Sequence, residues 1–237
     1  MNGRFHGMSG WGAAQCATLS LAVAALVMPL TAAQSARPGR ITGTVTTTAS
    51  TPRAIRVGFD QQVCGAQQPN EAIVVGPRGA LANVVVTVRG LTARTPAREV
   101  RVVNERCAFV PRVQVVAPGG TMATSSRDPV LHTTVLQTPD GRQVLNLALP
   151  SPAVELRRPL PGTGTLRVGC STHQWMRGWI VVTDEVSAVT GTDGTFTLPD
   201  LPPGRYEIAV WHEQLRASTQ MVSVTAGQSV PITFAMQ

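Results

Sequence analysis

The sequence predicts an all-β protein with many turns. Its 237 residues include 22 glycines and 18 prolines, which are residues that end strands and form turns. No amphipathic helical pattern persists for more than a few residues, whereas short runs rich in valine and threonine recur along the chain. In the central region, eight such runs fall within about 85 residues, which is the strand density of a β-sandwich.

The first 33 residues predict a secretory signal peptide. Arg4 supplies the positive start, residues 19–30 form a short apolar core, and small residues lead up to Ala33. The alternative is a membrane anchor, but the apolar run is too short to span a bilayer and contains Pro29. We therefore expect export, cleavage near Ala33, and a periplasmic or secreted location.

The charge of the chain argues against nucleic-acid binding. Removing 33 of the 237 residues leaves 204, which is room for one large domain or two small ones. The formal net charge is +7, and every basic residue is an arginine. These arginines are scattered, and only 4% of the residues are aromatic and able to stack on bases. We expect a basic, soluble surface with a mild preference for acidic partners.

Three cysteines remain once the signal segment, which contains Cys16, is set aside: Cys64, Cys107 and Cys170. An oxidising compartment favours pairing, but three cysteines cannot all pair within one chain. The predicted disulfide is Cys64–Cys107, which leaves Cys170 free for the reason given below. The alternative is that Cys64 and Cys107 are small buried apolar residues.

Three groups of strand-like runs follow one another along the chain. The first group is expected at 41–47, 54–57, 72–75 and 82–89, before a polar break at 91–98. The second group is expected at 100–103, 112–116, 121–125, 130–135, 144–149, 154–156, 165–170 and 179–183. The third group contains turns at 192–196 and 201–204, with strands at 205–211, 220–224 and 230–234.

The third group resembles a known family. Its segments Asp-Gly-Thr-Phe at 193–196 and Leu-Pro-Pro-Gly-Arg-Tyr at 201–206 are similar to the carboxypeptidase regulatory-like family, a small transthyretin-like β-sandwich. Such a domain normally begins with a strand like the one at 39–45, which lies far upstream here. We therefore expect a split regulatory-like domain at 39–96 and 186–237, with a second module inserted at 97–185. The alternative is two consecutive domains. In the split arrangement, a Cys64–Cys107 bridge ties the insert to its host.

His212 and Glu213 invite comparison with a zinc peptidase. Such enzymes place their ligands on one face, as in H-E-x-x-H, and no second histidine follows here. The family resemblance is also to a non-catalytic accessory domain. We expect His212 to pack or form hydrogen bonds at a strand end, and we expect no catalytic residues.

One short segment contains three candidate metal ligands. Cys170, His173 and Met176 have the spacing C-x2-H-x2-M, which lets one tight loop point all three side chains inward. A thiolate and two imidazoles suit both oxidation states of copper, and a weak axial thioether tunes the reduction potential. The fourth donor must come from another strand, so His132 and His212 are the candidates. We prefer His132, because it lies in the same group of strands as Cys170.

The segment 170–182, Cys-Ser-Thr-His-Gln-Trp-Met-Arg-Gly-Trp-Ile-Val-Val, resembles the ligand loop and last strand of cupredoxins of the amicyanin type. Upstream residues in the order of the plastocyanin-like family are Phe109-Val110-Pro111, Val115, Gly119, Gly120 and His132. The resemblance covers about residues 100–183. It implies a Greek-key β-sandwich with one mononuclear copper site, whose ligands are His132, Cys170, His173 and Met176.

The sequence departs from this family at two places. The asparagine that usually follows the first histidine and braces the cysteine loop is replaced by Thr133. The loop proline on either side of the second histidine is also missing, with Thr172 and Gln174 in those positions. These positions contact the ligands, so they affect the potential and the rigidity of the loop.

The cluster has two alternative interpretations, an ordinary strand end with a buried thiol and a zinc site, although a thioether is a poor zinc ligand. A multicopper oxidase is excluded, because too few histidines remain for a trinuclear cluster. Trp175 either lies beside an exposed edge of His173, where cupredoxins dock partners through an apolar patch, or packs inside the sandwich as we expect of Trp179.

Together these observations predict an exported type 1 copper protein that acts in electron transfer and is not an enzyme. Electrons would pass through His173 to a redox protein such as a cytochrome or a dehydrogenase. One alternative is a non-redox module for carbohydrate binding or adhesion. Another is copper storage or delivery with the same ligands.

Overall fold

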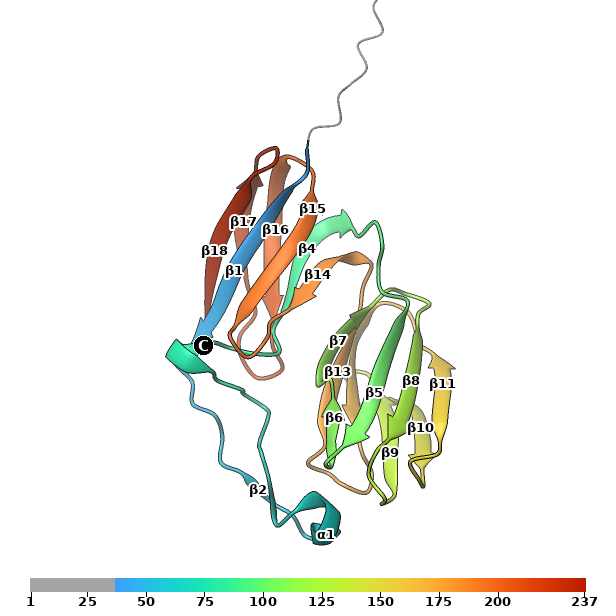
Figure 1. The fold of residues 1–237 in the computed structure, drawn as a ribbon. Helices are drawn as coiled ribbons and strands as arrows, with labels where there is room; N and C mark the ends of the chain where they lie inside the picture. Colours follow the sequence, from blue (N-terminus) through green and yellow to red (C-terminus); the bar gives the residue numbers. More distant parts are fainter. Residues whose placement is uncertain (1–36) are drawn as a thin grey trace, which may run out of the picture. The chain divides into compact units, whose positions relative to one another are not determined.

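β-Strands account for nearly all the regular structure in residues 37–237, the part of the chain that this computed structural model describes (Figure 1). The predicted signal peptide at 1–33 lies outside the described residues. Within 37–237, no helix has the length and apolar character that a membrane crossing requires. The predicted all-β class is confirmed.

The first sandwich consists of two sheets that share one hydrophobic core. One sheet has the order β15 (Thr195–Leu201), β1 (Gly39–Thr47), β18 (Ser229–Met236). The other has the order β14 (Glu185–Val189), β4 (Val85–Thr92), β16 (Gly204–Trp211), β17 (Ser218–Val224). Ile41 and Phe234 from the first sheet and Val86 and Ile208 from the second belong to the same buried cluster.

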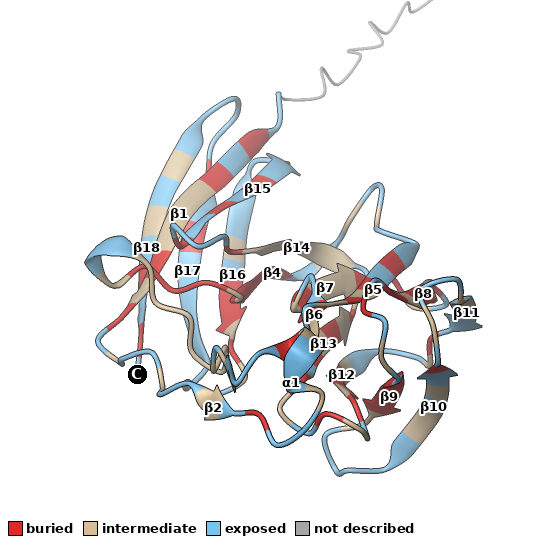
Figure 2. Ribbon diagram, turned by 60° about the horizontal axis from the view of Figure 1, so that its bottom comes forward, coloured by how far each residue is buried: buried red, intermediate tan, exposed pale blue. Residues whose placement is uncertain are grey.

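The second sandwich has a larger pair of sheets. One has the order β10 (Gln143–Leu149), β9 (His132–Gln137), β12 (Gly164–Gly169), β13 (Arg177–Val182), β7 (Val113–Val116). The other has the order β11 (Glu155–Pro159), β8 (Thr121–Ser126), β5 (Glu99–Glu105), β6 (Ala108–Val110). Leu136 and Ile180 from one sheet and Val102 and Met122 from the other share a core. Figure 2 shows buried residues along strands of both sandwiches.

Alternation of side chains explains how these strands build their cores. Along β5, Val100 and Val102 are buried whereas Glu99 and Arg101 are exposed or half-exposed. Successive side chains of a strand point to opposite faces, so one face of β5 faces the core and the other faces solvent.

Strands from distant parts of the chain meet in the first sandwich. Strand β1 pairs in parallel with β18 and antiparallel with β15, and β4 pairs with both β14 and β16. The first sandwich is therefore assembled from residues 39–92 and 185–236, and the strands of the second come from residues 99–182.

An excursion between β1 and β4 connects the two sandwiches. It contains β2 (Ile55–Arg56), α1 (Gln61–Cys64), β3 (Gln67–Gln68) and the 3-10 turn η1 (Pro77–Gly79). Cys64 in α1 is bonded to Cys107 in the turn between β5 and β6, which confirms the predicted disulfide. The bridge spans 43 residues of sequence, and a link of this kind typically stabilises a fold by about 2–4 kcal/mol.

The prediction of a strand at 72–75 is wrong. Residues 71–73 form a turn, in which the Ala72 N–H bonds the Asn70 side chain. Val75 makes only an isolated bridge to Leu81, and its N–H bonds the hydroxyl of Thr51. The apolar run Ala-Ile-Val-Val has strand composition, but no neighbouring strand offers it a continuous ladder of hydrogen bonds.

The predicted turn at 192–196 depends on Gly194. Its φ of 70° is left-handed, and its carbonyl accepts the Val45 N–H at 2.8 Å. A Cβ at this position would lie 2.5 Å from the carbonyl oxygen of Val45. Glycine is therefore required for two reasons, the backbone conformation and the close approach of β1.

Gly194→Ala is expected to lower the free energy of unfolding by about 2–4 kcal/mol, because left-handed strain adds to overpacking. Gly227→Ala in the same sandwich is the matched control. Gly227 has a φ of 68°, but its nearest neighbour is a side-chain carbon at 3.8 Å, so strain alone should cost about 1–2 kcal/mol. Urea unfolding measures the free energy of unfolding of both variants. An equal decrease in the two variants would contradict the proposal that the close contact with Val45 adds to the cost at Gly194.

Candidate metal centre

Two strand ends bring the candidate ligands together. Strand β12 ends at Gly169, so Cys170 begins the loop that leads to β13. His132 is the first residue of β9, which pairs with β12 through Val135 and Gly169. The hydrogen-bonded register therefore sets His132 beside the start of the loop.

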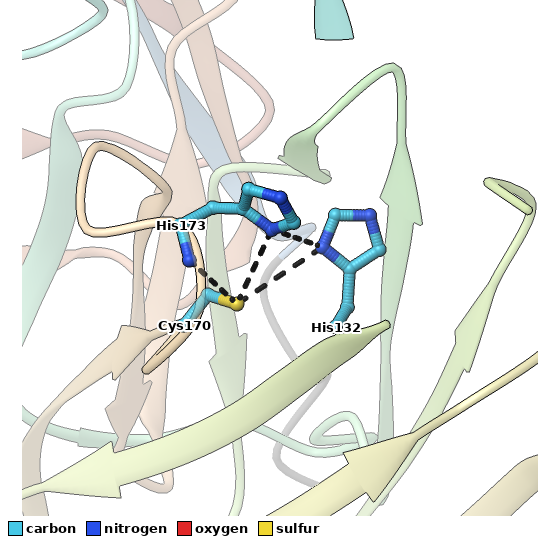
Figure 3. Close-up of side chains that lie close together, drawn as sticks. All are labelled: His132, Cys170 and His173. Carbon is cyan, nitrogen blue, oxygen red and sulfur yellow. Dashed lines mark hydrogen bonds between the residues drawn. The ribbon is translucent and has the colours of Figure 1, made fainter. Parts of the chain in front are cut away.

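The donor atoms of His132, Cys170 and His173 converge on one point (Figure 3). The two Nδ1 atoms are 3.0 Å apart. The Cys170 Sγ lies 4.0 Å from the Nδ1 of His132 and 3.8 Å from the Nδ1 of His173. All three side chains are buried, and both histidines are 0% exposed.

Each imidazole is oriented by a carboxylate on its far side. The Nε2 of His132 is 2.9 Å from Asp128 Oδ2, and the Nε2 of His173 is 3.1 Å from Asp60 Oδ2. A carboxylate accepts hydrogen bonds, so an N–H at each Nε2 donates to it, and each Nδ1 faces the centre. At 3.0 Å the two Nδ1 atoms are close enough to share a proton or to bind one metal ion.

The size of this triangle fits a single metal ion. With sides of 3.0, 3.8 and 4.0 Å, the point equidistant from the three donor atoms is about 2.1 Å from each, which is a metal–ligand bond length. A triangle of this size would hold either copper or zinc, and the thioether of Met176 is the feature that favours copper.

Hydrogen bonds hold the Cys170 sulfur in place. The N–H groups of Thr133 and His173 point at it from 3.3 and 3.4 Å, and the Thr133 hydroxyl lies 3.6 Å away. The same hydroxyl accepts the Ser171 N–H at 2.7 Å. Thr133 thus braces the cysteine loop in the position where the related family carries asparagine.

The electrostatics of Cys170 favour the thiolate. Burial raises the pKa of the thiol, but hydrogen bonds involving His132, Thr133 and the His173 N–H outweigh it and lower the pKa to about 6 from 9.0. A metal ligand must be a thiolate, so this environment prepares the sulfur for binding.

Met176 completes the ligand loop as a buried residue. It belongs to the same apolar cluster as Cys170, and its N–H bonds the His173 carbonyl at 2.9 Å, closing the turn. Its thioether is the weak donor that a trigonal copper site accepts on its axis.

Both alternatives for Trp175 hold in part, because its ring lies beside the His173 imidazole, with centroids 5.0 Å apart, and also packs against the core, while the edge of His173 is covered. The Phe59 ring stacks on the His173 imidazole, with centroids 5.2 Å apart and planes at 22°, and Asp60 covers the Nε2. Trp175 is partly buried, and its indole N–H bonds the Cys107 carbonyl at 3.1 Å, so it packs against the sandwich. Phe59, which is 47% exposed, is the aromatic ring between His173 and solvent.

His212 lies apart from the cluster. It is buried at the end of β16, and its Nδ1 accepts the Gln214 N–H at 3.2 Å. Burial lowers the pKa of His212, and Arg112 adds to this effect while Glu213 opposes it. The hydrogen-bonding role expected of His212 agrees with these contacts.

Sequence reasoning missed Phe59, Asp60 and Asp128. Asp128 precedes His132 by four residues, a spacing that has no meaning until the turn between β8 and β9 is known. The place of Asp60 near the second sandwich could have been inferred from the sequence, because it lies four residues before Cys64. The predicted bridge to Cys107 already carried that segment to the second sandwich.

One family model matches the last part of the chain. The carboxypeptidase regulatory-like domain model matches residues 179–237, about a quarter of the chain, which confirms the resemblance in the third group of strands. The match covers β14 to β18, whereas their partners β1 and β4 precede it. No curated protein matches the chain.

Among solved structures, the chain is similar to a purple cupredoxin from Nitrosopumilus maritimus, with 17% identity and a TM-score of 0.32, over 35% of this chain and 98% of that one. It is similar to an amicyanin from Paracoccus versutus, with 17% identity and a TM-score of 0.32, over 41% and 96%. A copper-containing nitrite reductase from Thermus scotoductus has 18% identity and a TM-score of 0.29, over 58% and 28%.

In the metal-free protein, the Cys170 thiolate should form with a midpoint near pH 6 and not near 9, so it predominates at neutral pH. Ultraviolet absorbance of the thiolate during a pH titration measures this. Thr133→Val removes the hydroxyl and keeps the N–H, so it should move the midpoint upward. A midpoint unchanged in Cys170→Ser would show that another group produces the signal.

Proposed function

We propose that this chain is an exported mononuclear copper protein that transfers electrons and catalyses no reaction of its own. His132, Cys170 and His173 would hold the ion, with Met176 as the weak axial donor. The observation that carries this proposal is the pair of facing Nδ1 atoms 3.0 Å apart, each backed by a carboxylate, with a thiolate completing the triangle. A bound copper ion would supply a one-electron couple between Cu(I) and Cu(II).

The donor chemistry supports copper over zinc. Structural zinc sites use four strong donors, whereas this cluster offers three strong donors and a thioether. Asp60 and Asp128 lie on the far side of the imidazoles, where each is bonded to an Nε2 atom, so neither faces the converging donor atoms.

Burial of the donors supports electron transfer over copper delivery. Delivery requires the ion to leave, and His132 and His173 are both 0% exposed behind Phe59, Asp60 and Asp128. Electron transfer leaves the ion in place and needs only a nearby contact. A partner that touches the half-exposed Phe59 would come within one aromatic ring of His173. We propose a redox protein, such as a cytochrome or a dehydrogenase, as that partner.

Titration of the metal-free protein with Cu(II) should give one equivalent of bound copper and an intense blue colour. Cys170→Ser should abolish the colour, because the colour requires the copper–thiolate bond. His212→Gln is the matched control, a buried histidine outside the cluster, and it should keep the colour. A wild-type protein that binds no copper would overturn the proposal and favour a non-redox binding or adhesion module.

Voltammetry of the copper-loaded protein should give a reversible one-electron wave, because buried and braced donors change little between oxidation states. Met176→Leu should raise the reduction potential, since the thioether stabilises Cu(II). Met221→Leu changes an exposed methionine and should leave the potential unchanged. Blue copper without a reversible wave would instead favour copper storage.

A further inference from the structure

The two carboxylates that orient the ligand histidines are held at the two ends of one disulfide. The Asp128 carboxylate accepts the N–H of Arg106 at 2.7 Å and that of Cys107 at 2.8 Å, in addition to bonding His132. The Asp60 carbonyl accepts the N–H of Cys64 at 2.8 Å, while its carboxylate bonds His173. Each half-cystine is therefore hydrogen-bonded to the residue that fixes one imidazole.

The Asp60 side chain contacts His173 and does not cap its own helix. It occupies the N-cap position of α1, where aspartate normally accepts an N–H of its own helix, yet its side chain makes no capping bond. Its backbone is also left-handed, with a φ of 53°. The carboxylate is turned instead to the Nε2 of His173, which lies 113 residues away in sequence.

The tight turn between β5 and β6 forms the other end of the bridge. Arg106 and Cys107 are its two central residues, with φ values of 52° and 59°, as two-residue hairpin turns require. This turn aims the N–H groups of both residues at the Asp128 carboxylate.

We propose that Asp60 is a positioning residue for the metal ligand His173, carried in by the excursion between β1 and β4 and fastened by Cys64–Cys107, so that the metal centre is complete only when this disulfide is formed. This inference rests on the proposed function. The second sandwich supplies every ligand, but the Nε2 partner of His173 and the ring that covers it, Phe59, belong to the excursion.

The metal-free protein provides the first test, because it needs no copper. Nitrogen-15 NMR at about pH 8, where imidazoles are neutral, should show a His173 Nε2–H that is hydrogen-bonded and slow to exchange. Asp60→Gly keeps the left-handed backbone and removes the carboxylate, so this signal should be lost. Asp60→Asn keeps an acceptor oxygen and should rescue it in part. An unchanged signal in Asp60→Gly would overturn the proposal.

Copper release to a chelator provides the second test. Asp60→Gly should release Cu(II) about 10–100-fold faster than the wild type, the range expected when an outer partner of a metal-bound histidine is removed. The double variant Cys64→Ser, Cys107→Ser should release copper as fast as Asp60→Gly. Asp200→Gly is the matched control, because Asp200 also has a positive φ, 57°, and contacts no ligand.

The outcomes separate the two proposals. If the wild type binds no copper, the proposed function fails, and the NMR test still decides whether Asp60 orients His173. If the wild type binds copper and Asp60→Gly releases it at the wild-type rate, the positioning role of Asp60 is overturned while the copper site stands. Fast release from the cysteine double variant alone would show that the disulfide acts without Asp60, which also overturns the proposal.

Discussion

The arrangement of the second sandwich centres on two imidazole nitrogens that face each other at 3.0 Å. Two nitrogens at this distance can share a proton or bind one metal ion, and the surrounding structure holds both rings in place. Each ring is fully buried and has a carboxylate behind it. The Cys170 thiolate, favoured by its hydrogen bonds, then makes the centre attractive to a cation.

The two sandwiches contribute to the centre in different ways. Strand ends of the second sandwich set the ligands, because the register of β9 against β12 places His132 opposite the start of the Cys170 loop. The excursion from the first sandwich brings Phe59 and Asp60 over His173. The disulfide is the covalent link between these contributions, and it lies beside the centre and not at the periphery.

Features that are local in sequence could be predicted, and features that depend on distant contacts could not. The spacing of Cys170, His173 and Met176 lies within one loop, and assigning Cys170 to that loop left Cys64 and Cys107 to pair. The run at 72–75 has strand composition but finds no partner strand, which composition alone does not reveal. The contact between Asp60 and His173 joins residues 113 positions apart, so no local pattern revealed which residues cover His173.

A closed centre is a physical advantage for one-electron chemistry. An electron moves most readily when the ligands need not rearrange, and rigid donors favour this more than mobile ones do. Thr133 braces the sulfur through its N–H and hydroxyl, and two carboxylates brace the imidazoles. The cost of closure is that a partner cannot touch a ligand directly. In the proposed function, Phe59 would provide that contact, because it is stacked on His173 and is 47% exposed.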